Sequence, residues 1–202
     1  MEQKLEFLKQ YPLSNIQIEK IFNGHHKMLS YHELYQYDTL EHLLHVNNGS
    51  VIIMYHQTDT YGHYCCINKL TEKNKFHKKK ELVEFFDPYG LFPDKQLKLA
   101  SYKNNAMNSS PNSEISKAQG HTYLSYLMYN SPYKLSFNEH RFQGPNTQTC
   151  GFHCTNRILF KELLLPEYKK WMDSSRKKLN QLLNQKTTYD DVVVVNLFDK
   201  VK

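Results

Sequence analysis

The sequence predicts an α+β fold, in which a mixed central sheet packs against a helix that carries Cys150 at its N-terminus. Short apolar runs bounded by turn residues predict strands at 50–55, 63–70 and 82–86. A longer apolar stretch at 151–165 has helical spacing. Strands and helices are interleaved along the chain, and this pattern is the basis for the α+β class.

The chain of 202 residues is expected to form a single domain, 1–202, because this length can bury roughly 70% of the unfolded surface. The charged start M-E-Q-K-L-E does not resemble a signal peptide, and no apolar run reaches the roughly 18–20 residues of a membrane span. We therefore expect no membrane partner. The 4 cysteines are too few for a disulfide scaffold, which favours a reducing compartment.

Two short helices are expected before the first strand. The first spans 14–21 and begins at a cap formed by Ser14 or Asn15. The second spans 39–46, with Asp38 as its cap.

The next two strands bring two polar residues together. His63 begins the strand 63–70, and Asp87 follows the strand 82–86 at a Pro-Gly turn. If these strands are antiparallel neighbours joined by 73–80, the start of one lies beside the end of the other. His63 and Asp87 could then touch.

The middle of the chain contains a loop, a helix and an extended segment. Residues 109–116 are rich in serine and predict a surface loop. A helix is expected over 120–128, and 134–143 is expected to be extended and to deliver Gln143.

The C-terminal part is expected to contain two helices and a strand. Pro166 is interpreted as the end of the helix 151–165, and 167–186 as an amphipathic, basic helix. The apolar run 192–197 predicts a buried strand. The residues expected on the inner face of the basic helix are Trp171, Leu179, Leu182 and Leu183.

Cys150 lies where unpaired N–H groups and the positive end of the helix dipole stabilise a thiolate. The alternative is a buried core thiol, which describes most intracellular cysteines. The presence of His63 and Asp87 favours a reactive Cys150 over a core thiol. A thiol protease needs a thiol, an imidazole and a carboxylate that fixes the imidazole tautomer. Cys150, His63 and Asp87 supply this set, in the chain order His, Asp, Cys.

Four segments carry a specific resemblance. The strings G-H-Y at 62–64, F-D-P-Y-G at 86–90 and Q-G-P-N at 143–146 with C-G at 150–151 resemble the active-site blocks of the adenovirus maturation protease family, adenain and its relatives in large DNA viruses and virophages. More distantly, their order is similar to that of proteases that process ubiquitin-like modifiers. The resemblance implies an adenain-like fold and one cysteine protease domain.

The resemblance also implies roles for individual residues. Cys150 would be the nucleophile, His63 the general base, Asp87 its orienting carboxylate and Gln143 a side-chain donor to the oxyanion. The chain departs from the family pattern at Tyr64, where the family usually has Trp, and at Asp87, where the adenoviral enzyme has Glu. Neither change removes a chemical function.

The chemistry of acyl transfer supports the role of Gln143. A tetrahedral intermediate places negative charge on the former carbonyl oxygen, and donors fixed around that oxygen stabilise it. The Gln143 side chain and the backbone N–H of Cys150 would form such a pair. The alternative is a solvent-exposed loop glutamine.

The function that the resemblance implies is that of an endopeptidase, which cleaves viral capsid or structural precursor proteins during virion maturation. The expected location is the virion and the infected host cell, in cytoplasm or nucleus. Two alternatives stay open: an isopeptidase acting on ubiquitin-like modifiers, which the same active site could serve, and a noncatalytic DNA-binding virion protein.

No cofactor is required for this chemistry, and no metal site is expected. Zinc is the competing interpretation, but no C-x-x-C pair is present, and Cys65 and Cys66 point to opposite faces of a strand. The zinc ligands would come from His63, Cys65, Cys66, Cys150, His153 and Cys154.

The net charge of +6 is concentrated in lysine-rich segments at 73–80 and 169–178. Such segments are either solvated surface or nonspecific contacts to DNA phosphates. The adenoviral relative uses DNA and a disulfide-tethered peptide as activators, so the resemblance leaves both open here. The candidates for such a disulfide are Cys65, Cys66 and Cys154.

Overall fold

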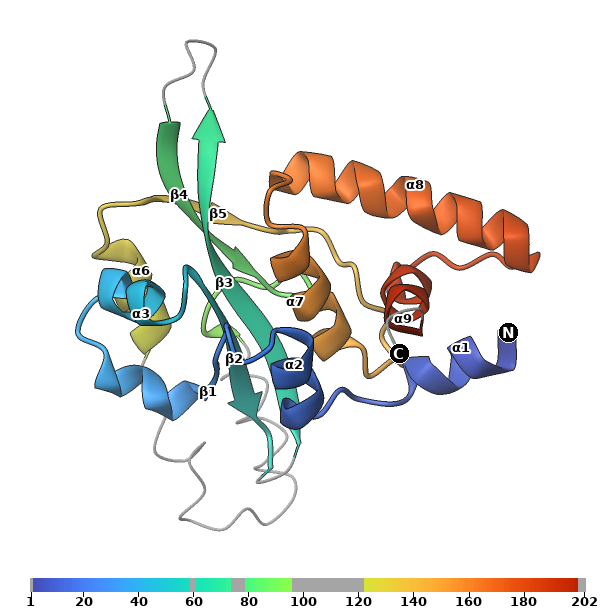
Figure 1. Cartoon of the computed structure of the whole chain (residues 1–202), viewed down its shortest axis with the longest axis horizontal. Helices are drawn as coiled ribbons and strands as arrows, with labels where there is room; N and C mark the ends of the chain where they lie inside the picture. Colours follow the sequence, from blue (N-terminus) through green and yellow to red (C-terminus); the bar gives the residue numbers. More distant parts are fainter. Residues whose placement is uncertain (1, 59–60, 74–78, 96–121, 200–202) are drawn as a thin grey trace.

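The structure, a computed structural model, describes residues 2–58, 61–73, 79–95 and 122–199 (Figure 1). These residues form an α+β fold around a mixed sheet of five strands, which confirms the predicted class. The strand order follows the chain; β1/β2 and β4/β5 are parallel, and the inner pairs are antiparallel. The strands are β1 (Met28–Ser30), β2 (Ser50–His56), β3 (Gly62–Lys73), β4 (Lys79–Phe86) and β5 (Lys134–Phe137).

Helices cover both faces of the sheet (Figure 1). On one face, α7 (Cys150–Leu159) lies against β3 and is surrounded by the N-terminal and C-terminal helices. The surrounding helices are α1 (Glu2–Lys9), α2 (Asn15–Ile21), α8 (Leu165–Leu183) and α9 (Asp191–Asp199). The opposite face is covered by the 3₁₀ helix η1 (Tyr31–Gln36), α3 (Leu40–Val46) and α6 (Tyr123–Tyr129).

Two hydrophobic cores explain why the strands are recognisable as continuous apolar runs. Ile52 and Cys66 pack into the core on the α7 side, while Val51 and Cys65 pack into the core on the other side. Strands buried on both faces have few polar positions. The expectation that Cys65 and Cys66 point to opposite faces is therefore confirmed.

The predicted helix 151–165 was too long. The helix α7 ends at Leu159, which is 52% exposed, and α8 begins at Leu165. Pro166 occupies the first turn of α8, where its missing N–H costs no hydrogen bond. It marks the start of a helix, not the end of one.

The predicted strand at 192–197 was wrong, because this segment lies in α9. The side chains of Val192, Val193, Val194 and Val195 are all buried, among residues of α1, α7 and α8. A short run without polar positions gives no periodicity that distinguishes a buried helix from a buried strand. The helix forms because its side chains pack on all sides, and this packing outweighs the preference of valine for strands.

The caps of two short helices and the inner face of α8 differ in part from the expectations. Ser14 caps α2 as expected, but the cap of α3 is Thr39, not Asp38. On α8, Leu182 is 77% exposed and does not face inward; the buried residue of this helix nearest its start is Tyr168. The predicted loop at 109–116 lies outside the described residues, and so does most of the lysine-rich segment before β4.

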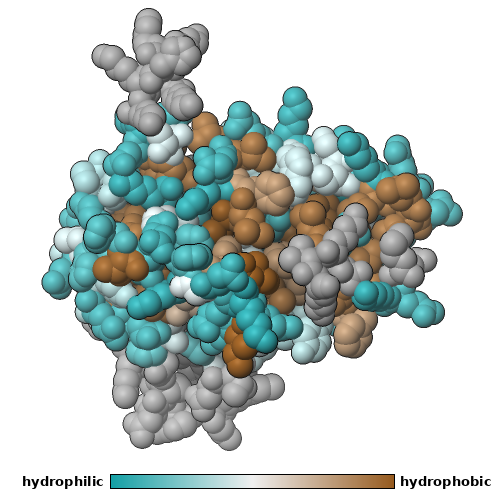
Figure 2. Space-filling view, viewed as in Figure 1, coloured by the Kyte–Doolittle hydropathy of each residue, from teal (hydrophilic) through white to brown (hydrophobic). Residues whose placement is uncertain are grey.

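Within the described part of the chain, no helix is long and apolar enough to cross a membrane. Figure 2 shows mainly hydrophilic side chains over the α3 side of the molecule and more hydrophobic ones over α7, α8 and α9. Phe160, Leu163 and Trp171 are partly buried and pack against the core on the α7 side.

Candidate active site

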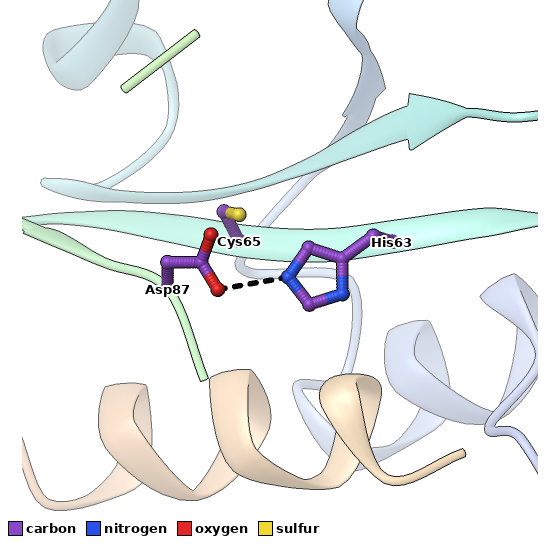
Figure 3. A group of neighbouring side chains, drawn as sticks. All are labelled: His63, Cys65 and Asp87. Carbon is purple, nitrogen blue, oxygen red and sulfur yellow. Dashed lines mark hydrogen bonds and ion pairs between the residues drawn. The ribbon is translucent and has the colours of Figure 1, made fainter. Parts of the chain in front are cut away.

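The expected contact between His63 and Asp87 is present. Because β3 and β4 are antiparallel, with Cys66 opposite Phe86, the start of β3 lies beside the end of β4. His63 Nε2 lies 2.9 Å from Asp87 Oδ1, and both side chains are buried (Figure 3). Gly62 permits this strand start, since a Cβ there would collide with the carbonyl oxygen of Tyr55.

The Asp87 carboxylate is held by the turn that follows it. The Tyr89 backbone N–H donates to Asp87 Oδ1 at 2.7 Å. Asn138, just after β5, accepts from the Asp87 backbone N–H at 2.8 Å and donates to its carbonyl oxygen at 2.7 Å. The strand β5 thereby fixes the position from which Asp87 reaches His63. Asn138 was not predicted from the sequence, because its partner lies far away in the chain.

Cys150 begins α7 and contacts the imidazole of His63, whose Nε2 is already bound to Asp87. Its side chain is buried and packs with the core on the α7 side, as the alternative interpretation expected, but it also lines a cleft. Burial lowers the pKa of His63, but the Asp87 carboxylate and the Cys150 sulfur outweigh burial and raise this pKa to about 10. The Asp87 carboxylate therefore favours the imidazolium form of His63 at neutral pH.

Gln143 lies at the same cleft and is 1% exposed, so the alternative of a solvent-exposed loop glutamine is wrong. The Gln143 Nε2 donates to the carbonyl oxygen of Thr147 at 2.9 Å. The Gln143 backbone N–H donates to the carbonyl oxygen of Pro88 at 3.0 Å. The amide is thus fixed by its own loop and by the turn after β4. It retains a second N–H on the same nitrogen.

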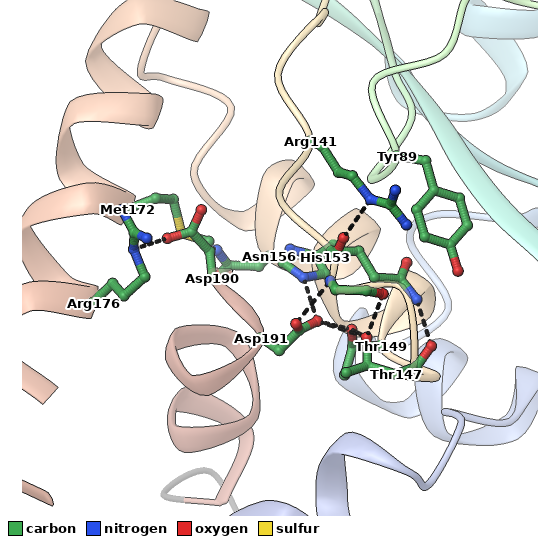
Figure 4. Close-up of polar contacts among 12 residues, drawn as sticks. Tyr89, Arg141, Thr147, Thr149, His153, Asn156, Met172, Arg176, Asp190 and Asp191 are labelled. Atoms are coloured by element: carbon green, nitrogen blue, oxygen red, sulfur yellow. Dashed lines mark hydrogen bonds and ion pairs between the residues drawn. The ribbon is translucent and has the colours of Figure 1, made fainter. Parts of the chain in front are cut away.

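The loop between Gln143 and Cys150 is anchored by Asp191, at the start of α9 (Figure 4). The Gly144 backbone N–H donates to Oδ2 at 2.9 Å, the Thr147 hydroxyl donates to Oδ1 at 3.0 Å, and the Thr149 hydroxyl also donates to Oδ1. One carboxylate therefore sets the path of the loop that leads to the first turn of α7.

His153 completes this anchor from within α7. Its Nε2 lies 3.2 Å from Asp191 Oδ1, and the side chain is fully buried. Burial raises the pKa of Asp191, but the hydrogen bond and charge of His153 and the bond from Thr149 outweigh burial and give a net decrease. Asp191 was not predicted as a site residue, because the apolar run after it was interpreted as a strand. An acidic residue before that run was the only local signal, since such residues favour helix starts.

A cleft of about 1290 Å³ opens at Cys150 and His63. Tyr89 forms one wall and stacks on the His63 ring, with ring centres 4.7 Å apart and planes 14° apart. Tyr64 also lines the cleft and donates its hydroxyl to Asn15 at 2.7 Å. An aromatic side chain at this position therefore packs between the cleft and α2.

The zinc ligand set considered from the sequence is divided by the fold. Cys66 lies on the other face of β3 from Cys65, and His153 is bound to Asp191. Among the described residues, His63, Cys65 and Asp87 do come within 4.8 Å of one another. However, the His63–Asp87 hydrogen bond uses two of these donors, and burial with the Asp87 charge raises the pKa of the Cys65 thiol well above its usual value. Cys65 is thereby kept as a thiol, a poor metal ligand.

A second group of metal-type ligands, His140, Asp173 and Asp190, lies beside α8. The Arg176 guanidinium lies between two of these residues, at 2.7 Å from Asp173 and 3.0 Å from Asp190. Figure 4 shows its contact with Asp190. A resident cation of this kind opposes a metal ion.

The fold and this site define an α+β protein with a buried His–Asp pair beside a cysteine at a helix N-terminus. No known family profile matches the chain. It is 31% identical over 172 residues to "Uncharacterized protein V9" of Sputnik virophage, an alignment that covers 84% of this chain and 88% of the relative. The chain therefore belongs to the family of this virophage protein. The relationship places it among viral proteins.

Proposed function

We propose that this protein is a cysteine endopeptidase of a DNA virus or virophage that cleaves structural precursor proteins during particle maturation. The observation that carries the proposal is the contact chain Asp87–His63–Cys150 at an open cleft. The kinship with a virophage protein supports a viral substrate and a location in the virion or infected cell. It also favours this function over the isopeptidase alternative, although the chemistry would be the same.

In the proposed reaction, the Cys150 sulfur attacks the scissile carbonyl carbon. The carbonyl π electrons move to oxygen, where the backbone N–H of Cys150 and the Gln143 amide stabilise the charge. The His63 imidazolium then gives its proton to the leaving amine as the C–N bond breaks, which leaves a thioester on Cys150. Water, deprotonated by His63, attacks the thioester and releases the acid and the thiolate. Asp87 keeps the His63 ring and its proton oriented throughout.

DNA is a second proposed partner and a candidate activator. Exposed lysines along α8, namely Lys169, Lys170, Lys177 and Lys178, support this proposal. The alternative of a noncatalytic DNA-binding protein is less well supported, because such a protein would not need a His–Asp pair in contact with a cysteine.

The test is to incubate the purified protein with co-encoded capsid precursors and to sequence the new N-termini. We expect defined cleavage sites that are absent with Cys150→Ala. Intact precursors in the presence and absence of DNA would refute the endopeptidase proposal.

A further inference from the structure

One basic side chain distinguishes the walls of the cleft. Arg141 is the only lysine, arginine or carboxylate among the described residues that line it. The other lining residues are neutral polar, aromatic or aliphatic, apart from His56 and His63. Resting on the proposed function, we propose that Arg141 binds a carboxylate of the substrate, in the segment that leaves after cleavage.

The Arg141 guanidinium is held in place before any substrate binds. Its Nε donates to the carbonyl oxygen of Gln143 at 3.0 Å. Its central carbon lies 4.9 Å from the ring centre of Tyr89 and 5.8 Å from that of Tyr189. Figure 4 shows the guanidinium directed at Tyr89, with its dashed contact made through Nε. Little side-chain entropy is therefore left to lose on binding.

The terminal nitrogens of Arg141 remain available. Within the described part of the chain, no ion pair or hydrogen bond involves Nη1 or Nη2, and the residue is exposed. A planar guanidinium presents these N–H groups in a fork that matches the two oxygens of a carboxylate. A lysine or arginine of the substrate at this place would meet like charge instead.

The position of Arg141 relative to His63 indicates which part of the substrate it meets. His63 must lie next to the leaving amine, because it supplies the proton to that nitrogen. Tyr89 stacks on His63, and Arg141 lies against the same Tyr89 ring. Arg141 therefore faces residues that follow the scissile bond. The carboxylate is either an Asp or Glu side chain or a free C-terminus close to the cut.

The test is cleavage profiling with paired peptides. Starting from a cut site, Asp is compared with Asn at each of the first positions after the bond, and a free C-terminus with its amide. The wild-type protein should prefer one carboxylate by roughly 10-fold or more in kcat/KM, as expected for a charge-assisted hydrogen bond. Arg141→Gln should bring that ratio close to one. Arg141→Glu should bring it below one, and should favour a peptide that has Lys at the same position. Lys20→Gln, which removes an exposed charge on α2 outside the cleft lining, is the matched control and should keep the wild-type ratio.

Equal cleavage of the acid and amide peptides by the wild-type protein would overturn the inference while leaving the endopeptidase proposal intact. If no peptide is cut, the proposed function fails, and the carboxylate site is tested by binding alone. The Nε–Hε NMR signal of Arg141 should then shift more with acetyl-Gly-Gly-Asp-amide, or with acetyl-Gly-Gly-Gly acid, than with acetyl-Gly-Gly-Asn-amide. Equal shifts with all three peptides would contradict it.

Discussion

Two buried histidine–carboxylate pairs flank the start of α7, and they differ in what surrounds them. His63 and Asp87 lie 2.9 Å apart and His153 and Asp191 3.2 Å apart. The first pair meets Cys150 and an open cleft. In the second pair the carboxylate is saturated by the loop 144–149, and His153 Nδ1 has no partner among the described residues.

A buried histidine–carboxylate pair is therefore not sufficient to define a reactive site. His63 lies between an anion and a thiol that can exchange a proton with it, whereas His153 has a carboxylate on one side only. We therefore propose a catalytic role for the first pair and a positioning role for the second. The following substitutions test this assignment, beginning with the largest expected effect.

Cys150→Ala and His63→Ala should each lower turnover by about 10⁶-fold, because members of a catalytic unit are not additive. His153→Ala should act differently. It removes one of the hydrogen bonds to Asp191 Oδ1, which keeps those of Thr147 and Thr149, and should lower the free energy of unfolding by roughly 1–3 kcal/mol. Turnover and thermal unfolding of all three variants separate the effects. A folded His153→Ala protein as inactive as His63→Ala would break the comparison.

Asp87→Asn should lower turnover by roughly 10⁴-fold, since an amide stabilises the wrong tautomer of His63. It should also lower the pKa of His63, which is about 10 in the wild-type protein. The sign follows from charge, because removing the carboxylate anion makes the imidazolium less favourable. NMR titration of the His63 ring measures this shift. An unchanged pKa together with wild-type turnover would remove Asp87 from the mechanism.

Gln143→Ala should lower kcat by roughly 10²–10³-fold with little change in KM, as expected for a donor that acts on the developing oxyanion. Gln148→Ala is a matched control from the same loop, since this side chain also lines the cleft. Single-turnover kinetics with one peptide separate kcat from KM. An equal loss in both variants would mean that the loop, not the Gln143 amide, was disturbed.

Asp191→Asn should lower kcat by about 10-fold and weaken the fold by roughly 1–3 kcal/mol, because two or more donors lose a charged acceptor. The pKa of Asp191 is lowered in the folded protein, so its stabilisation is complete above the ordinary value of 3.8 and is lost as pH falls through the lower folded value. The stability difference between wild type and variant should therefore shrink in acid. Thermal unfolding between neutral and acidic pH measures it, and a constant difference would argue against this role.

The smallest effect on cleavage is expected on α8. Replacing Lys169, Lys170, Lys177 and Lys178 by Gln should leave peptide cleavage without DNA unchanged, because none of them lines the cleft. If these lysines bind phosphates, DNA affinity should fall, and the slope of log K against log salt should decrease by about 0.9 for each phosphate that is no longer neutralised. Fluorescence anisotropy with duplexes of arbitrary sequence measures this. Absence of binding by the wild-type protein at low salt would leave these lysines as solvated surface.

The first pair could be predicted from the sequence and the second could not, for physical reasons. Gly62 and the Pro-Gly turn after Asp87 fix where two strands begin and end, and a short antiparallel connection then places His63 beside Asp87. These signals are local. Asp191 meets its partners across a long stretch of chain, and the valines after it carry no periodicity that reveals a helix.

The reactivity of Cys150 relative to Cys154 tests the central assignment most directly. The two thiols lie one turn apart on α7, but Cys154 is fully buried with a pKa raised well above its usual value by burial. Iodoacetamide labelling at neutral pH, followed by peptide mass mapping, should modify Cys150 far faster than Cys154. His63→Ala should strongly slow the labelling of Cys150, and Asp191→Asn should preserve the wild-type rate. Equal labelling of both thiols in the wild-type protein, or labelling of Cys150 that does not depend on His63, would contradict the assignment of the first pair to chemistry.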